Sequence, residues 1–220
     1  MNAQPPIIHI VDDDDSFRRA VSRLLQAAGF AVQAYASAGE FLLARSGEKP
    51  GCVLLDVQMP GLDGLDLHAA LAKQEAPLPV VFVTGHGDIP MSVRAMKTGA
   101  VDFLTKPVKR EALVRAVEAA LARDAQQRAA REKTRRWREC FESLTPRERE
   151  VFEQVTSGKL NKQIAAEIGA AERTVKAHRA NIMVKMQVQS IAELVHIAAL
   201  LNSESRSVQE SVFSPRVTHH

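Results

Sequence analysis

The 220-residue sequence contains few cysteines, few aromatic residues and no long hydrophobic segment. Its two cysteines, Cys52 and Cys140, are too few for a disulfide framework or an all-cysteine zinc site. No uninterrupted apolar run approaches the ~20 residues that cross a bilayer, and Met1–Pro6 lacks the basic and apolar parts of a secretory signal. We therefore expect a protein of the reducing cytoplasm with no membrane partner.

The remaining composition is that of a globular chain, with 45% hydrophobic and 25% charged residues. The formal net charge of +3 is unevenly distributed. Residues 1–121 contain 12 Lys+Arg and 14 Asp+Glu, a balance of −2, whereas residues 122–220 contain 17 and 12, a balance of +5. This asymmetry predicts two domains with different partners, and the basic domain is a candidate for binding nucleic acid.

The first 121 residues alternate between short apolar runs and stretches with helical spacing of apolar residues. The five predicted strands are Ile7–Val11, Ala31–Tyr35, Val53–Leu55, Val80–Val83 and Val101–Leu104. Strands that alternate with helices predict an α/β fold, a doubly wound parallel sheet covered on both faces. Because the carboxyl ends of such strands meet at one edge, polar residues that follow different strands converge there.

Five residues that follow these strands suit phosphoryl chemistry. Asp12 and Asp13 follow the first strand, Asp56 the third, Thr84 the fourth and Lys106 the fifth. Neighbouring carboxylates repel each other unless a cation is bound, and oxygen ligands of this kind suit Mg²⁺. A lysine and a threonine hydroxyl can bind phosphoryl oxygens. The set predicts phosphoryl transfer to one carboxylate, with Asp56 as the nucleophile and Mg²⁺ neutralising charge.

The same residues leave two other interpretations open. A single aspartate after a strand is usually a turn or helix cap, and we expect Asp14 or Asp15 to be one. A Mg²⁺-dependent phosphohydrolase would also form an aspartyl-phosphate, but it would carry an Asp-x-Asp motif after the first strand, where Asp12 and Asp13 are adjacent instead. A third class, an adaptor that binds only proteins, would not need the helix pair described next.

The second half of the chain is predicted to be helical. Residues 122–142 are polar and contain no glycine or proline, which predicts a long exposed helical linker, with or without a partner. Residues 143–203 contain four short helical stretches and form a small all-α domain, and Thr145-Pro146-Arg147-Glu148 has the pattern of a capping box. Residues 204–220 are rich in serine and are predicted to be disordered. Residues 5–121 are the expected first domain, so the chain is predicted to consist of this domain, the linker, the all-α domain and the tail.

Residues 161–180 have the pattern of a helix-turn-helix. The apolar residues spaced to hold its two helices together are Ile164, Ala165, Ile168 and Val175. The exposed face of the second helix suits the major groove, where basic side chains contact phosphates and base edges. The candidate DNA contacts are Lys162, Thr174, Lys176, Ala177, His178, Arg179 and Ala180. A charged helix pair of this kind is also typical of a solvated surface, so the pattern alone leaves DNA binding open.

Seven motifs resemble those of two-component response regulators. Those similar to the receiver domain are Ile10–Asp14, Leu54–Gly64, Thr84–Asp88 and Phe103–Pro107. Those similar to the LuxR-type helix-turn-helix domain are Leu144–Glu150, Asn161–Ala165 and Arg173–Arg179. Together they resemble the NarL/FixJ class, and in particular its FixJ and StyR-like branch. The resemblance implies a sheet in the order 2-1-3-4-5.

The resemblance also implies roles for the residues at the sheet edge. Asp56 would accept a phosphoryl group from a sensor histidine kinase. Asp13, Asp56 and the backbone carbonyl of Gln58 would bind Mg²⁺ directly, and Asp12 would act mainly through water. Thr84 and Lys106 would hold the phosphoryl oxygens. The remaining implications concern Phe103, which would turn inward as Thr84 moves, and a cis Lys106–Pro107 bond.

For the whole chain, the resemblance implies a phosphorylation-activated transcription regulator rather than an enzyme. Its partners would be the kinase, promoter DNA, RNA polymerase and a second copy of the chain on phosphorylation. The dimer contacts would be the face of the fourth helix and fifth strand of the receiver and the apolar face of Ser190–Leu201. The StyR-like branch further implies genes for the breakdown of aromatic hydrocarbons. Ala180 departs from the family, which often has a basic residue there.

Overall fold

The computed structural model of the chain describes residues 5–45, 49–85 and 89–212, with side chains up to Asn202. It contains two compact units, which meet between Ala129 and Ala130. No helix in the described part of the chain is long and apolar enough to cross a membrane.

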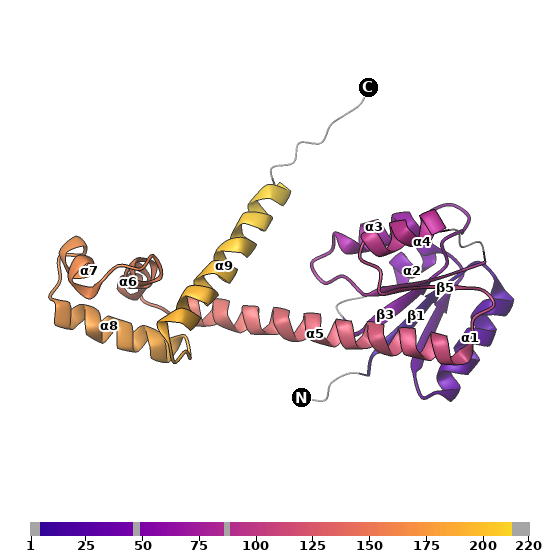
Figure 1. Cartoon of the computed structure of the whole chain (residues 1–220), viewed down its shortest axis with the longest axis horizontal. Helices are drawn as coiled ribbons and strands as arrows, with labels where there is room; N and C mark the ends of the chain where they lie inside the picture. Colours follow the sequence, from indigo (N-terminus) through magenta and orange to yellow (C-terminus); the bar gives the residue numbers. More distant parts are fainter. Residues whose placement is uncertain (1–4, 46–48, 86–88, 213–220) are drawn as a thin grey trace, which may run out of the picture. The chain divides into compact units, whose positions relative to one another are not determined.

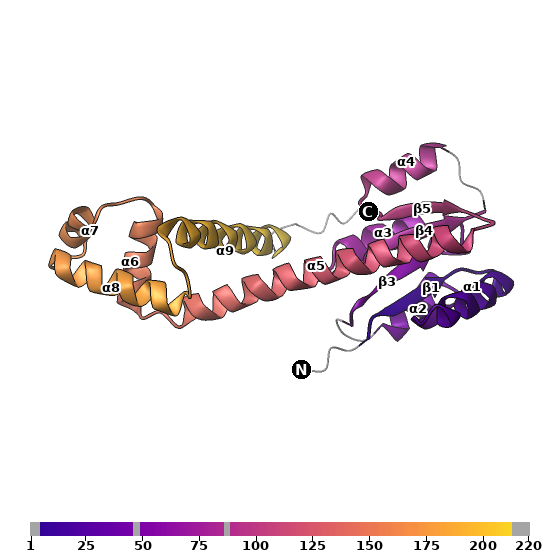
Figure 2. The ribbon, with the colours of Figure 1, turned by 60° about the horizontal axis from the view of Figure 1, so that its bottom comes forward.

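The first unit contains a five-stranded parallel sheet in the order β2-β1-β3-β4-β5. Figures 1 and 2 show this sheet in two views. The strands are β1 Ile7–Val11, β2 Ala31–Tyr35, β3 Gly51–Leu55, β4 Val80–Thr84 and β5 Asp102–Thr105. The predicted α/β fold, its five strands and their order are confirmed. Short β-branched and leucine-rich runs such as β3 and β4 are buried along their whole length, as a sheet covered on both faces requires.

Alternate residues of the central strands supply two separate cores, one on each face of the sheet. Val53 and Leu55 lie in the core formed with α2 Ala38–Ala44, α3 Gly64–Ala72 and α4 Ile89–Lys97. Cys52 and Leu54 lie in the core formed with α1 Asp15–Ala27 and the first part of α5 Arg110–Glu142. The period of two along each strand therefore fixes which helices cover which face.

Local signals begin and end the helices at the predicted places. Asp14 is the N-cap of α1, and its side chain accepts hydrogen bonds from the backbone N–H groups of Ser16 and Phe17. Gly29, with a φ of 91°, takes the left-handed conformation just after this helix. The prediction that Asp14 or Asp15 is a cap is confirmed for Asp14.

The second unit contains the end of α5 and four further helices around one core. They are α6 Pro146–Thr156, α7 Asn161–Glu167, α8 Glu172–Lys185 and α9 Ile191–Val212. The predicted capping box of α6 is present: the Glu148 backbone N–H donates to the Thr145 hydroxyl, and the Glu148 carboxylate accepts from the Thr145 backbone N–H. The backbone of α9 is helical to Val212, which corrects the expectation of disorder from residue 204; no glycine or proline interrupts this stretch. Residues 213–220 lie outside the described part.

The expected linker, residues 122–142, is anchored near both ends. Asp124 is 2% exposed, and its Oδ2 accepts hydrogen bonds from the Gly51 backbone N–H (3.0 Å) and from Arg128 Nε (2.8 Å). Arg128 also donates to the Lys49 carbonyl oxygen at 2.5 Å. In the second unit, Trp137 lies against the core. The expectation that this whole stretch is exposed is therefore wrong at its two ends, because polar and aromatic side chains dock the helix where the apolar stripe has faded.

Candidate functional site

The predicted sheet-edge residues meet in the first unit. Asp12 and Asp56, at the ends of β1 and β3, are 1% and 6% exposed. Lys106, directly after β5, reaches both: its Nζ lies 2.6 Å from Asp12 Oδ2 and 2.8 Å from Asp56 Oδ2. The Phe17 ring supports the ammonium group from the other side, with Nζ 4.1 Å from the ring centroid. Residues about 50 and 94 positions apart in the sequence thus form one charged cluster, as parallel strand ends allow.

The carboxylates of the cluster carry more charge than Lys106 balances. Ligand atoms of Asp12, Asp13 and Asp56 all lie within 4.8 Å of one another, and Asp13 is exposed to solvent. Burial raises the pKa of Asp12, despite its hydrogen bond to Lys106. Burial alone would lower the pKa of Lys106, but its hydrogen bonds to the two carboxylates outweigh this effect and raise it. Three carboxylates with one ammonium group are a donor set that fits a divalent cation with oxygen ligands.

Two backbone features hold Asp56 in place. Gly64, the first residue of α3, approaches so closely that a Cβ at this position would lie 2.1 Å from the Asp56 carbonyl oxygen. The Gln58 backbone N–H donates to Asp56 Oδ1 at 3.2 Å, which turns the loop around the carboxylate. Glycine at position 64 is therefore required for α3 to begin against this loop.

Thr84 and Phe103 lie on the neighbouring strands. Thr84 ends β4 and is 1% exposed. Phe103 in β5 is half-buried and packs against the core beside Phe82, with ring centroids 6.3 Å apart. The Lys106–Pro107 peptide bond is cis, which confirms that expectation. Of the loop that follows Thr84, residues 86–88 lie outside the described part.

The predicted helix-turn-helix is formed by α7 and α8 of the second unit. The four apolar residues that were expected to hold the helices together are buried: Ile164, Ala165, Ile168 and Val175. Lys162, Thr174, Lys176, Ala177 and Ala180 are exposed. The basic and small side chains of α8 therefore face solvent, opposite its contact with the core.

Two of the candidate DNA contacts are less exposed than expected. Arg179 is half-buried, and its Nη1 donates to Asn161 Oδ1 at 2.6 Å. His178 is also half-buried. The helical spacing did not reveal that Asn161, at the start of α7, lies within reach of Arg179. Arg173 is part of a sequence motif but was not predicted as a DNA contact; it is exposed in the first turn of α8 and belongs with the candidates.

The apolar face expected to form a dimer contact in Ser190–Leu201 is mostly used within the unit. Leu194 and Ala198 are 1% and 7% exposed and belong to the core, whereas Val195 is 40% exposed. The sequence pattern identified an apolar face correctly but could not distinguish packing within one chain from packing between two. This correction leaves Val195 as the exposed remnant of that face.

Comparison with known proteins assigns both units. Residues 8–118 match the family model of the response regulator receiver domain, and residues 142–198 match that of bacterial regulatory proteins of the luxR family. Nodulation protein W of Bradyrhizobium diazoefficiens is 43% identical over 205 residues, 93% of this chain and 90% of that protein. Response regulator protein TodT of Pseudomonas putida is 43% identical over 201 residues, 91% of this chain and 88% of that protein.

Two solved structures are similar over most of their length. The response regulator StyR matches with a TM-score of 0.74 and 47% identity, covering 89% of this chain and 99% of StyR. Full-length FixJ from B. japonicum matches with a TM-score of 0.54 and 41% identity, covering 88% of this chain and 96% of FixJ. The chain belongs to the NarL/FixJ-type response regulators, transcription regulators of two-component systems that join a receiver to a LuxR-type DNA-binding domain.

Proposed function

We propose that Asp56 is the phosphoacceptor and that its phosphorylation by a sensor histidine kinase activates the protein. The main support is the pairing of Lys106 Nζ with Asp56 Oδ2 at 2.8 Å in a cluster of three carboxylates. Lys106 can follow the carboxylate and bind an oxygen of the incoming phosphoryl group. The buried Thr84 hydroxyl hydrogen-bonds another oxygen, and the inward Phe103 ring follows the movement of Thr84.

Mg²⁺ fits the carboxylate cluster as the cofactor. Asp13, Asp56 and the Gln58 carbonyl would bind it directly, and Asp12 would act mainly through water. Asp12 is already paired with Lys106, whereas Asp13 is solvent-exposed and free to accept an ion. When bound, Mg²⁺ would supply positive charge that offsets the negative charge of the carboxylates and the phosphoryl group. The protein uses this chemistry as a switch and not for turnover, so it is not an enzyme in the usual sense.

The test of this proposal is the intact mass after incubation with acetyl phosphate and Mg²⁺. The wild type is expected to gain about 80 Da, one phosphoryl group, and Asp56→Asn to gain nothing. Circular dichroism of both proteins checks that the variant is folded. A gain that persists in Asp56→Asn would refute the assignment. An unchanged mass of the folded wild type with both acetyl phosphate and a histidine kinase would refute the switch.

We further propose that α8 reads promoter DNA in the major groove. Lys162, Thr174, Lys176, Ala177, His178, Arg179 and Ala180 are the proposed contacts. The phosphorylated protein binds as a homodimer in the cytoplasm and recruits RNA polymerase. The resemblance to the StyR-like branch supports genes of aromatic-hydrocarbon breakdown as the target class. Dimerisation would double the phosphate contacts.

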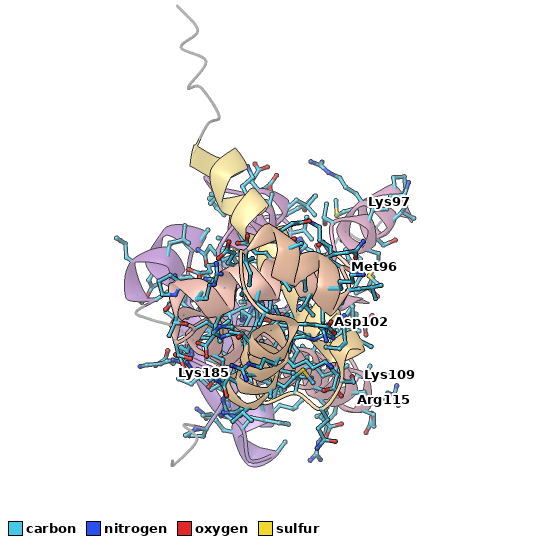
Figure 3. All side chains as sticks on the ribbon, turned by 90° about the vertical axis from the view of Figure 1, so that its left-hand side faces the viewer. Met96, Lys97, Asp102, Lys109, Arg115 and Lys185 are labelled. Carbon is cyan, nitrogen blue, oxygen red and sulfur yellow. The ribbon has the colours of Figure 1, made fainter. Side chains whose placement is uncertain are left out.

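The proposed dimer face lies on α4 and β5. Figure 3 shows Lys97, Met96, Asp102, Lys109 and Arg115 along one side of the first unit. Met96 is 48% exposed, so it offers apolar surface among charges of both signs. Met96→Glu is expected to prevent the dimer that acetyl phosphate induces, measured by light scattering. Leu43→Glu, at an exposed apolar position on α2, is the matched control. Equal dimerisation of both variants would refute this face.

A further inference from the structure

The positive charge of the second half of the chain is concentrated outside the helix-turn-helix domain. Residues 128–139, hereafter the basic segment, contain six Lys+Arg and two Asp+Glu, a balance of +4. Residues 143–202 contain eight Lys+Arg and six Asp+Glu, a balance of only +2 over five times the length. A domain that binds a polyanion is therefore nearly neutral, while the helix that leads into it is strongly basic.

Most basic side chains of residues 143–202 are already engaged within the protein. The contacts join Arg147 to Glu150, Arg149 to the Glu142 carbonyl oxygen, Lys159 to Glu167, Lys176 to Glu172, Arg179 to Asn161 and Lys185 to Glu148. Affinity for DNA at physiological salt comes largely from neutralised phosphates, each of which needs a cationic side chain. Exposed pairs such as Lys176–Glu172 could exchange their partner for phosphate, but Arg179 and Lys185 hold Asn161 and the buried Glu148.

The basic segment presents its arginines as a stripe. Arg131, Arg135 and Arg138 recur at intervals of four and three residues, which places them on one face of α5. Trp137 and Phe141 occupy another face and pack against the core of the second unit. At 3.6 residues per turn, the centres of the two faces lie roughly 105° apart around the helix. The arginine stripe thus lies on a different side of α5 from the aromatic anchors; Arg135 and Arg138 are exposed, whereas Arg131 is half-buried.

The aromatic anchors fix this stripe within the second unit. The Trp137 ring makes an edge contact with His196 of α9, with centroids 6.4 Å apart, and the Phe141 ring makes one with Phe152 of α6 at 5.0 Å. The arginines therefore belong to the same packed body as α8.

The ion pairs within the basic segment are weak competitors for phosphate. Arg135 and Arg136 share Glu132, and their side chains are 64% and 72% exposed. Exposed pairs of this kind contribute about 0–1 kcal/mol and are screened by salt. A phosphate can replace the carboxylate as the partner of a guanidinium group, which binds both bidentately.

We propose that the arginine stripe of the basic segment is a second DNA-binding surface, which contacts the phosphate backbone beside the site read by α8. Its contribution is independent of base sequence, because phosphate contacts carry no direct sequence information. It would supply the charge that the helix-turn-helix domain itself lacks. This inference extends the proposed function but does not depend on which α8 residues read the bases.

The test compares the salt dependence of binding to a labelled random-sequence duplex, using the full-length protein. The stripe variant is Arg131→Gln/Arg135→Gln/Arg138→Gln. The matched control, Arg19→Gln/Arg23→Gln/Lys73→Gln, removes the same charge from exposed positions of the receiver. Glutamine keeps a helix propensity close to that of arginine and lysine. Anisotropy titrations between about 50 and 200 mM NaCl give the slope of log K against log salt.

The stripe variant is expected to reduce this slope by about 2–3, at about 0.9 for each lost phosphate contact, while the control keeps the wild-type slope. Equal slopes for the stripe variant and the control would overturn the proposal, as would a changed oligomeric state of the stripe variant in light scattering. Lys162→Ala/Lys176→Ala tests α8 separately. If only this variant weakens binding, the stripe proposal fails alone; if only the stripe variant does, the α8 contacts fail alone.

Discussion

His9 makes the stability of the receiver dependent on pH. It lies in β1, is 6% exposed, stacks against the Tyr35 ring and makes an edge contact with the Phe41 ring. The Tyr35 hydroxyl donates to Gln33 Oε1 and lies 3.2 Å from His9 Nδ1, so the neutral ring can donate to it. Burial, followed by the positive charges of Arg45 and Lys49, lowers the pKa of His9 from 6.5 to about 4.

The sign and size of the effect follow from proton linkage. Between pH 4 and 6.5 the unfolded chain binds more protons at this site than the folded protein, so stability rises with pH across this window and is lost as the pH falls. One pKa unit corresponds to about 1.36 kcal/mol, so the difference between the pKa values of His9 in the unfolded and folded chain changes the free energy of unfolding by about 3 kcal/mol. About 2.5 kcal/mol of it would be lost between about pH 7.5 and 4.5.

The perturbation is His9→Phe, which keeps an aromatic ring in the stack and removes the titrating group. Urea unfolding would be followed by circular dichroism and by the fluorescence of Tyr35, the single tyrosine, which lies in the same unit. Between about pH 7.5 and 4.5, the free energy of unfolding of the wild type is expected to fall by about 2.5 kcal/mol more than that of the variant. Asp12, whose pKa is raised, titrates in both proteins and cancels in the comparison. Parallel pH profiles of the wild type and the variant would refute the reasoning.

Three further predictions concern packing and ion pairs. Gly64→Ala is expected to lower the free energy of unfolding by about 1–3 kcal/mol and to prevent most phosphorylation, because the added Cβ would collide with the Asp56 carbonyl. Normal stability of this variant in urea would contradict the prediction. Glu148→Gln is expected to lower the free energy of unfolding by about 1–2 kcal/mol at neutral pH and by less in acid, since the hydrogen bond from Lys185 lowers the pKa of Glu148. A loss that stays constant from neutral to acidic pH would argue against this pair. Asp124→Ala is expected to speed hydrogen exchange at the start of β3 without slowing phosphorylation; unchanged exchange would refute the anchor.

The sequence was sufficient to predict those features that follow from strand geometry. Asp12, Asp56 and Lys106 could be brought together because parallel strands end at one edge, and their ion pairs confirm that they meet. The close approach of Gly64 to the Asp56 loop was not predicted, because it depends on where α3 begins in space.

The features that were missed depend on partners distant in the sequence. Asp124 lies in a polar stretch that is typical of an exposed helix, yet its partner is a backbone N–H 73 residues away. Arg179 has the right spacing for a DNA contact, but Asn161 binds it across the turn. The apolar face around Leu194 was visible in the sequence, whereas its burial in the same unit was not. Periodicity gives the direction of a side chain on its own helix but not what lies opposite.

The distribution of rare residues gives each unit its own natural reporters. Cys52 is fully buried in β3, where burial raises the pKa of its thiol to about 12, whereas Cys140 in α5 is only partly buried. The single tyrosine lies in the first unit and the single tryptophan, Trp137, in the second. Pulsed thiol labelling and fluorescence can therefore follow the opening of the two units separately in the unaltered protein, without introduced dyes or cysteines.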